Sequence, residues 1–335
     1  MTVTIKDVAR AAGVSPSTVS RVISNHPRIS KATAEKVRRI MDELGYHPNL
    51  AAKSLVSKTT YTLGVFLPRP AEELFLNLFF AEFIRGIVTR ASKSGYDILM
   101  TSCPSEQDEI SALNRLMSGK RVDGIILLTS RRNDPVVQYL NEQQFPFILI
   151  GRSEEYPDVL SVDNDNVQAS YDATMHLIKR GHTRIGFISG PPHLILSHDR
   201  KKGYEQAMRE AGLEIREDWI IEEEFLQESG YRAMSILMSL SERPSALVVV
   251  DDIVAFGILR GLHELGYQVP QDMSLISFNN TALTELSSPP ISSVDISIYQ
   301  LGYLASQNLI HTIQGSYAGE PRTIVPHRLI LREST

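Results

Sequence analysis

From residue 61 onward, the chain alternates short, continuously apolar runs with longer amphipathic segments. Strands buried on both faces read as continuous apolar runs, and a parallel pair of strands needs a crossover connection, usually a helix. The alternation therefore predicts βαβ units that build doubly wound parallel sheets. The expected strands cover residues 62–68, 96–102, 122–129, 145–151, 183–190, 218–225, 246–252 and 273–279.

A weak repeat of glycines divides this region into two similar halves. In each half, a glycine in an expected strand is followed by one within a helix and, nine residues later, by one at the helix end. The two sets are Gly64, Gly86 and Gly95, and Gly186, Gly203 and Gly212. We expect two lobes, about 61–162 with 292–321 and about 163–291 with 322–335. A ligand would bind between them, at the carboxyl ends of the strands.

The first 46 residues read instead as three short helices. Apolar residues recur at i, i+3, i+4 and i+7 over residues 5–12, and Gly13 ends this helix in a sharp turn. Ser30 is placed to cap a third helix, which Gly45 stops. Residues 47–60 then read as a hinge with a short helix, too short to be stable alone.

The second helix, from Pro16 to about Asn25, carries an unusual number of hydroxyl groups. Ser15 is placed as its N-cap, and Pro16 suits the first helical position. We expect valines to hold this helix to the others (Val14, Val19 and Val22), and polar residues to face outward (Ser17, Thr18, Ser20 and Arg21). Two capped helices joined by a tight turn make a helix-turn-helix, whose second helix can read a major groove. The same pattern also fits an ordinary amphipathic surface helix.

The charge is distributed unevenly along the chain. Residues 1–58 hold ten Lys or Arg and four Asp or Glu, a net charge of +6. The remainder holds 24 basic and 35 acidic residues, a net charge of −11. A small basic module joined to a larger acidic body is typical of nucleic-acid-binding proteins.

The stretches "VTIKDVARAAGVSPSTVSRVI" and "KVRRIMDELGYHPNLAAKSL" resemble the headpiece and hinge of the lactose/galactose repressor (LacI/GalR) family. The resemblance continues more loosely through the body, whose lobes are similar to periplasmic sugar-binding proteins. "LPRPAEELFLNLFF" and "IGRS" are most similar to the maltose-operon repressors of this family. The implied organisation is a headpiece over 1–46, a hinge over 47–60 and an effector-binding, dimer-forming body over 61–335.

The resemblance implies DNA contacts at particular positions. Thr4 and Ile5 fall where the family contacts backbone phosphate, and Asn25 and His26 fall in the loop beside the groove. Leu55 falls on the hinge leucine that the family wedges into the minor groove, which would bend the DNA. The remaining implied contacts lie on the recognition helix and in the hinge: Ser15, Pro16, Ser17, Thr18, Ser20 and Arg21, and Asn49, Ala52 and Lys53.

The resemblance likewise implies effector contacts in the body. Arg200 falls on an arginine that hydrogen-bonds sugar hydroxyls, and Phe225 falls on an aromatic residue that stacks on the ligand. Asp251 and Asn279 follow expected strand ends, where polar groups would face a cleft, although a capping role is an alternative for each. Asp252 is the better candidate for a helix N-cap.

The sequence also departs from the family at the cleft. The family often has Asp at the end of the strand written here as "FILIG", where this chain has Gly151 followed by Arg152. Arg152 would then either take over a sugar contact or be solvated. Asn279 stands where several relatives carry Asp. We expect the segment 69–77 to line the cleft as well, through Arg69 and Asn77.

Other functional classes find little support. No apolar run approaches the roughly 18 residues that span a bilayer. The single Cys103 permits no intrachain disulfide and has no His or Asp at a telling spacing. The "SGPP" segment lacks the spacing of a phosphate-binding loop, and the histidines lack that of a metal site. We therefore expect no enzyme, no cofactor and no metal.

These observations predict a cytoplasmic, homodimeric repressor that reads a pseudopalindromic operator in double-stranded DNA. A small carbohydrate, a disaccharide such as maltose, would release it. One alternative is a catabolite-control regulator that responds to a phosphorylated carrier protein. The other is a sugar-binding receptor without a role on DNA, which would need an export signal that the N-terminus does not show.

Overall fold

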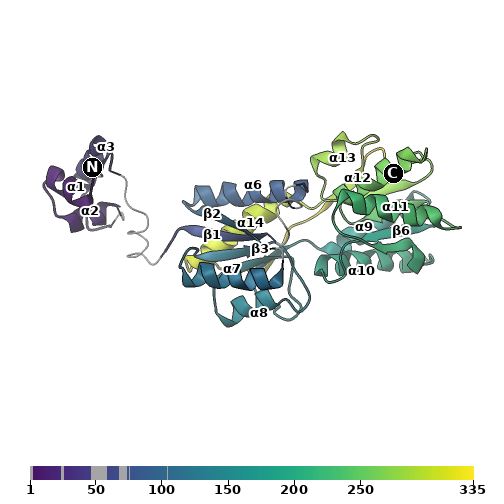
Figure 1. Ribbon diagram of the computed structural model, residues 1–335, viewed down its shortest axis with the longest axis horizontal. Coiled ribbons are helices and arrows are strands. Elements are labelled where there is room, and N and C mark those ends of the chain that lie inside the picture. The colour runs from purple at the N-terminus through teal and green to yellow at the C-terminus, as the bar shows by residue number, and fades with distance from the viewer. Residues whose placement is uncertain (1–2, 24–25, 47–58, 68–73, 75, 104) are drawn as a thin grey trace. The chain divides into compact units, whose positions relative to one another are not determined.

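The computed structural model describes residues 3–23, 26–46, 59–67, 74, 76–103 and 105–335. Internal contacts divide the chain into two units, Met1–Thr60 and Tyr61–Thr335, and each is described by itself (Figure 1). The described residues of the first unit form three helices, α1 (Ile5–Ala12), α2 (Pro16–Ile23) and α3 (Lys31–Leu44). This arrangement confirms the predicted helical headpiece.

Local sequence signals set the ends of these three helices. Gly13 ends α1 with φ of +66°, a left-handed conformation that favours glycine. The Ser30 hydroxyl accepts a hydrogen bond from the Thr33 amide at 3.2 Å and so caps α3. A small apolar core joins the helices, formed by Val8, Ala9, Ala12, Val19, Val22, Val37 and Ile40.

The second unit contains two six-stranded sheets with the same strand order. The first sheet runs β11 (Arg322–Ile324), β5 (Ser161–Asp163), β4 (Phe147–Ile150), β3 (Gly124–Leu127), β1 (Thr62–Leu67), β2 (Asp97–Ser102). The second runs β12 (Arg328–Ile330), β10 (Ser292–Asp295), β9 (Ser274–Phe278), β8 (Ala246–Val249), β6 (Ile185–Ser189), β7 (Ile220–Glu222). All neighbouring strands are parallel except the antiparallel pair of β10 and β12. The predicted pair of doubly wound lobes is confirmed.

Helices cover both faces of each sheet (Figure 1). On the first sheet these are α6 (Leu78–Lys93) with α14 (Ile298–Ile313), and α7 (Glu106–Ser118) with α8 (Pro135–Glu142). On the second sheet they are α9 (Asn166–Lys179) with α10 (Ile195–Glu210), and α11 (Gln227–Ser239) with α12 (Asp252–Glu264). The short α13 (Ala282–Leu286) follows β9. Burial of both sheet faces explains why the strands read as continuous apolar runs.

The glycine repeat marks the helix pairs of the two lobes. A Cβ on Gly86 would lie 2.2 Å from the carbonyl oxygen of Tyr299 on α14. A Cβ on Gly203 would lie 2.1 Å from the carbonyl oxygen of Val167 on α9. Both distances are far below van der Waals contact, so only glycine lets the backbones of each pair approach this closely.

Three chain segments cross between the lobes, and two crossings differ from the expected positions. β10 belongs to the second sheet and β11 to the first, so the chain crosses between the lobes after each of these strands. The expected crossings lay before them, at residues 292 and 322. Both strands are short and carry polar residues, so no apolar run revealed them. The Asn164 side chain, at the first crossing, donates to the carbonyl oxygens of Ile296 at 3.1 Å and Val325 at 2.8 Å. One side chain therefore ties all three crossings together.

Candidate effector cleft and nucleic-acid interface

Helix α2 presents a polar face above its apolar anchor. The Ser15 hydroxyl accepts a hydrogen bond from the Thr18 amide at 3.1 Å, which makes Ser15 the N-cap. The same hydroxyl lies 2.7 Å from that of Ser17 and 2.9 Å from that of Thr18. Val19 and Val22 are buried and Val14 is half-buried, whereas Pro16, Ser17, Ser20 and Arg21 are exposed. The exposed edge is therefore hydroxyl-rich and carries one guanidinium.

The start of α1 lies in a capping box. The Thr4 amide and hydroxyl both donate to the Asp7 carboxylate, at 3.0 and 2.6 Å. These two hydrogen bonds lower the pKa of the exposed Asp7 carboxyl. Thr4 is exposed and Ile5 is half-buried. His26 is half-buried, and its Nδ1 accepts from the Arg28 amide at 3.2 Å.

Several predicted contact residues lie outside the described residues. They are Asn25 in the loop after α2, Asn49, Ala52, Lys53 and Leu55 in the hinge, and Arg69 after β1.

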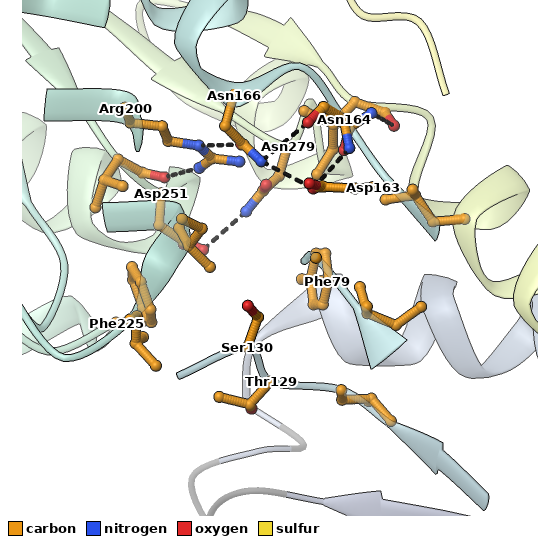
Figure 2. Close-up of a pocket in the computed structure, with 18 of the residues that line it drawn as sticks. Phe79, Thr129, Ser130, Asp163, Asn164, Asn166, Arg200, Phe225, Asp251 and Asn279 are labelled. Atoms are coloured by element: carbon orange, nitrogen blue, oxygen red, sulfur yellow. Dashed lines mark hydrogen bonds between the residues drawn. The ribbon is translucent and has the colours of Figure 1, made fainter. Parts of the chain in front are cut away.

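A cavity of about 300 Å³ lies between the lobes, at the carboxyl ends of their strands. The first lobe contributes an apolar and hydroxyl wall, including Phe79, Thr129 and Ser130. The second lobe contributes a polar wall that includes Arg200 and Asp251. Figure 2 shows the polar groups joined by hydrogen bonds, with the rings of Phe79 and Phe225 on opposite sides of the space. The cavity thus combines aromatic faces with a cluster of donors and acceptors.

Arg200, on α10, is the central group of the polar wall. Its residue is only 5% exposed, and its guanidinium lies 4.1 Å from the centre of the Phe278 ring. Nε donates to the Asn166 side-chain oxygen at 2.9 Å, and Nη1 donates to the Val250 carbonyl oxygen at 2.6 Å. Burial lowers the pKa of Arg200 to about 10, so the side chain remains charged at neutral pH.

Asp251 lies beside Arg200 and is bound from both lobes. Its Oδ2 accepts from Asn279 of the second lobe at 2.8 Å and from Asn77 of the first lobe at 3.3 Å. Its Oδ1 accepts from the Ile253 amide at 2.8 Å, so Asp251 is the N-cap of α12. Burial raises the pKa of Asp251 to about 6. Asn77 caps α6 in the same way, through the Phe79 amide at 2.9 Å.

The expectation that Asp252 is the N-cap is wrong. Asp252 is the first residue of α12 and is buried behind the cavity wall. Its carboxylate accepts hydrogen bonds from the hydroxyls of Ser277, Ser293 and Thr281, at 2.5, 2.8 and 2.9 Å. It therefore joins β9, β10 and α13 and does not reach the cavity.

Arg152 is not among the residues that line the cavity, and its side chain reaches the second lobe. It forms an ion pair with Asp199 on α10, whereas the preceding Gly151 lines the cavity. Gly151 has φ of +101°, and a Cβ there would lie 2.7 Å from Ser130 Cβ. The Asp that the family often carries has no room at this position. Arg152 is neither a cavity-lining residue nor merely solvated.

Sequence reasoning missed several cavity-lining residues. Asp163 is the last residue of β5, and Asn164 and Asn166 follow it in "SVDNDN", where polar residues at a strand end would have indicated the cleft. The strand itself has three residues and gave no apolar run. No local sequence pattern marked Phe79 or Ser130 as residues that line the cavity. Cys103 is buried, and burial raises the pKa of its thiol to about 11, which argues against a nucleophile.

Among the described residues, no helix is both long and apolar enough to cross a membrane. A family model of bacterial regulatory proteins of the lacI family matches residues 4–49. A model of a periplasmic binding protein-like domain matches residues 174–335.

Relatives match along the whole chain. The HTH-type transcriptional regulator MalR of Streptococcus pneumoniae is 38% identical over 98% of this chain and 99% of its own length. Catabolite control protein A of Priestia megaterium is 36% identical and covers 100% of both chains. The solved complex of the transcriptional regulator CelR with cellobiose is 31% identical, covers 99% of this chain and 100% of that chain, and has a TM-score of 0.78. The relatives are regulators and not enzymes, as expected. The chain belongs to the lacI family of bacterial regulatory proteins, and it is a DNA-binding transcriptional repressor with a sugar-binding domain.

Proposed function

We propose that this repressor controls carbohydrate-utilisation genes and that a small sugar of the maltose class releases it from its operator. The observation that carries the proposal is the cavity between the lobes. It is lined by a buried arginine, two aspartates and four asparagines, within reach of the rings of Phe79 and Phe225. A planar guanidinium suits neighbouring sugar hydroxyls, and an aromatic face suits the apolar face of a sugar ring.

Each polar group of the cavity would have a distinct part in binding. Arg200 would donate to sugar hydroxyls, and Asp251 and Asn279 would accept from them or donate to them. Phe225, which is half-buried in the second lobe, would stack on one ring. Asn77 reaches Asp251 from the other lobe. It would therefore couple sugar binding at Asp251 to closure of the two lobes. The similarity to MalR and to CelR, solved with a disaccharide, supports this class of ligand.

On DNA, two headpieces of a homodimer would read the halves of a pseudopalindrome. Ser17, Ser20 and Arg21 on the exposed edge of α2 would meet base edges and phosphates, with Arg21 donating to a guanine. Thr4 and His26 would contact the backbone beside the groove. Leu55 would wedge into the minor groove and bend the duplex. This activity would place the protein in the cytoplasm, with the chromosome.

Sugar would act by preferring one arrangement of the lobes, which in turn would favour or release the hinge. Coupling between two sites is typically about 1–3 kcal/mol, which changes affinity by roughly 5–150-fold. The similarity to catabolite control protein A favours a second candidate, in which a phosphorylated carrier protein acts on the body. A pull-down with the phosphorylated and unphosphorylated carrier would separate these two modes of control.

The test is a thermal-shift screen of the full-length protein against mono- and disaccharides, followed by calorimetry with each sugar that stabilises it. Maltose should raise the unfolding temperature and bind with one site per chain. Stabilisation by no sugar, together with capture of the phosphorylated carrier, would favour the second candidate.

A further inference from the structure

One charged side chain of each lobe meets the other beside the cavity. Arg152 follows β4 of the first lobe, and Asp199 lies on α10 of the second lobe, directly before Arg200. Arg152 Nε donates to Asp199 Oδ2 at 2.9 Å, and Nη2 donates to Oδ1 at 2.7 Å. This two-bond geometry fixes both the distance and the orientation of the groups. The ion pair therefore fixes the end of β4 against α10.

The pair lies next to the residues of the cavity wall and is partly exposed to solvent. The chain neighbours Gly151 and Arg200 line the cavity, but Arg152 and Asp199 do not. The Asp199 side chain is 8% exposed and that of Arg152 is 24% exposed. One side of the pair thus borders the cavity wall while the other reaches water.

The backbone around Arg152 is held in place by the first lobe. The Ser130 hydroxyl donates to the Arg152 carbonyl oxygen. Because Ser130 leaves no room for a side chain at Gly151, the end of β4 offers the ligand no functional group of its own. The first functional group after β4 is the guanidinium, which binds Asp199 across the cleft and also donates to Glu154 Oε1 of its own lobe at 3.1 Å.

Backbone hydrogen bonds next to the pair also join the lobes. The Ile195 amide donates to the Ser130 carbonyl oxygen at 3.1 Å. The Arg132 amide donates to the His193 carbonyl oxygen, also at 3.1 Å. These bonds break when the lobes separate here, so their amide protons report the opening of this side of the cleft.

We propose that the Arg152–Asp199 ion pair is a latch that closes this side of the cavity and limits the length of the sugar effector. The sugar class rests on the proposed function, whereas the latch rests on the contacts alone. The cavity of about 300 Å³ lies at the small end of ligand pockets, which span about 300–1,000 Å³. Its volume equals that of about ten water molecules at roughly 30 Å³ each, which is enough for one or two sugar rings. A longer chain that leaves the cavity on this side would have to pass where the ion pair stands.

The latch is tested first without sugar, by amide hydrogen exchange of the full-length protein. Asp199→Asn should speed exchange of the Ile195 and Arg132 amides by about tenfold, because local opening no longer breaks an ion pair. Glu223→Gln is the matched control, since Glu223 pairs with Arg232 at 2.6 Å within the second lobe. Unchanged exchange in Asp199→Asn, or equal acceleration in the control, would overturn the latch.

A double variant in which the two charges are exchanged controls for general damage to the fold. The double variant Arg152→Glu/Asp199→Arg should regain slow exchange relative to either single variant, because the opposite charges face each other again. If both single variants speed exchange and the reversed pair does not slow it, the ion pair is not the cause of closure.

The length limit is tested by calorimetry with maltose, maltotriose and maltotetraose. The unaltered protein should prefer maltose, and Asp199→Asn should reduce that preference by about tenfold, mainly through the rates of release. An equal change for all three sugars would show that the pair does not limit length. If no maltodextrin binds the unaltered protein, the maltose assignment fails, while the exchange experiment still decides the latch.

Discussion

The headpiece and the cleft present polar groups in opposite ways. On α2, the hydroxyls and Arg21 are close in sequence, and most are exposed. In the cleft, Asn166, Arg200, Asp251 and Asn279 come from different segments, and each is at most 7% exposed. The charged phosphates of DNA can bind to exposed polar groups, whereas a small neutral sugar binds well only where donors and acceptors are already held in position. Changes on the exposed edge of α2 should therefore alter binding alone, and changes in the cleft should alter binding and stability together.

The largest expected effect is that of Arg200→Ala. Hydrogen bonds to charged groups contribute about 1.5–3 kcal/mol each, so losing two should weaken sugar binding by at least about a hundredfold. The variant also leaves the Asn166 and Val250 oxygens without their donor, which should lower the free energy of unfolding by about 1–3 kcal/mol. Calorimetry and urea unfolding measure the two effects. Normal sugar affinity would refute the assignment of Arg200.

Arg21→Ala should have a smaller and purely local effect. A guanidinium that reads one guanine contributes about 1–3 kcal/mol, and the loss should fall on one base pair. The free energy of unfolding should change by less than about 0.5 kcal/mol, as expected for an exposed position. Binding to duplexes with single base-pair changes gives the first value. An equal loss on every sequence would show that Arg21 contacts only phosphate.

Leu55→Ala should reduce the bend of the DNA more than it reduces the affinity. An apolar wedge unstacks a base step and bends DNA by roughly 20–90°. Mobility of duplexes with the operator at different positions measures the bend angle. A bend angle that is unchanged in Leu55→Ala would show that Leu55 does not bend the DNA.

The smallest expected effect is a change in the pH dependence of stability. Burial raises the pKa of Asp252 to about 7, so its contribution is present below the unfolded pKa of about 4 and is lost as pH rises through about 7. The pKa of Asp7 is lowered by Thr4, so its contribution is present at neutral pH and is lost on acidification. Relative to the original protein, Asp252→Asn should be less stable at pH 5 than at pH 8. Asp7→Asn should lower the stability equally at these two pH values, and its effect should shrink as the pH falls below about 4.

Urea unfolding at pH 3, 5 and 8 provides the check. A difference between Asp252→Asn and the original protein that does not change with pH would show that Asp252 titrates as an exposed carboxyl does.

The contrast also explains which features the sequence predicts. Helix α2 follows from a cap, a proline and a period of apolar residues, all within ten positions, and eight strands follow from continuous apolar runs. β5, β10, β11 and β12 are short and partly polar, and three-dimensional pairing alone defines them. The cleft residues after β5 were missed for the same reason. The role of Arg152 depends on Asp199, which is 47 residues away, and no local pattern connects the two.

The most direct test of the account is whether sugar in the cleft controls binding of the headpiece to DNA. Fluorescence anisotropy would follow the full-length protein on a duplex selected from a random pool, with and without saturating maltose. Maltose should weaken binding by roughly 5–150-fold in the original protein and should have no effect in Arg200→Ala. Equal DNA affinity with and without maltose in the original protein, despite measurable sugar binding, would contradict the account.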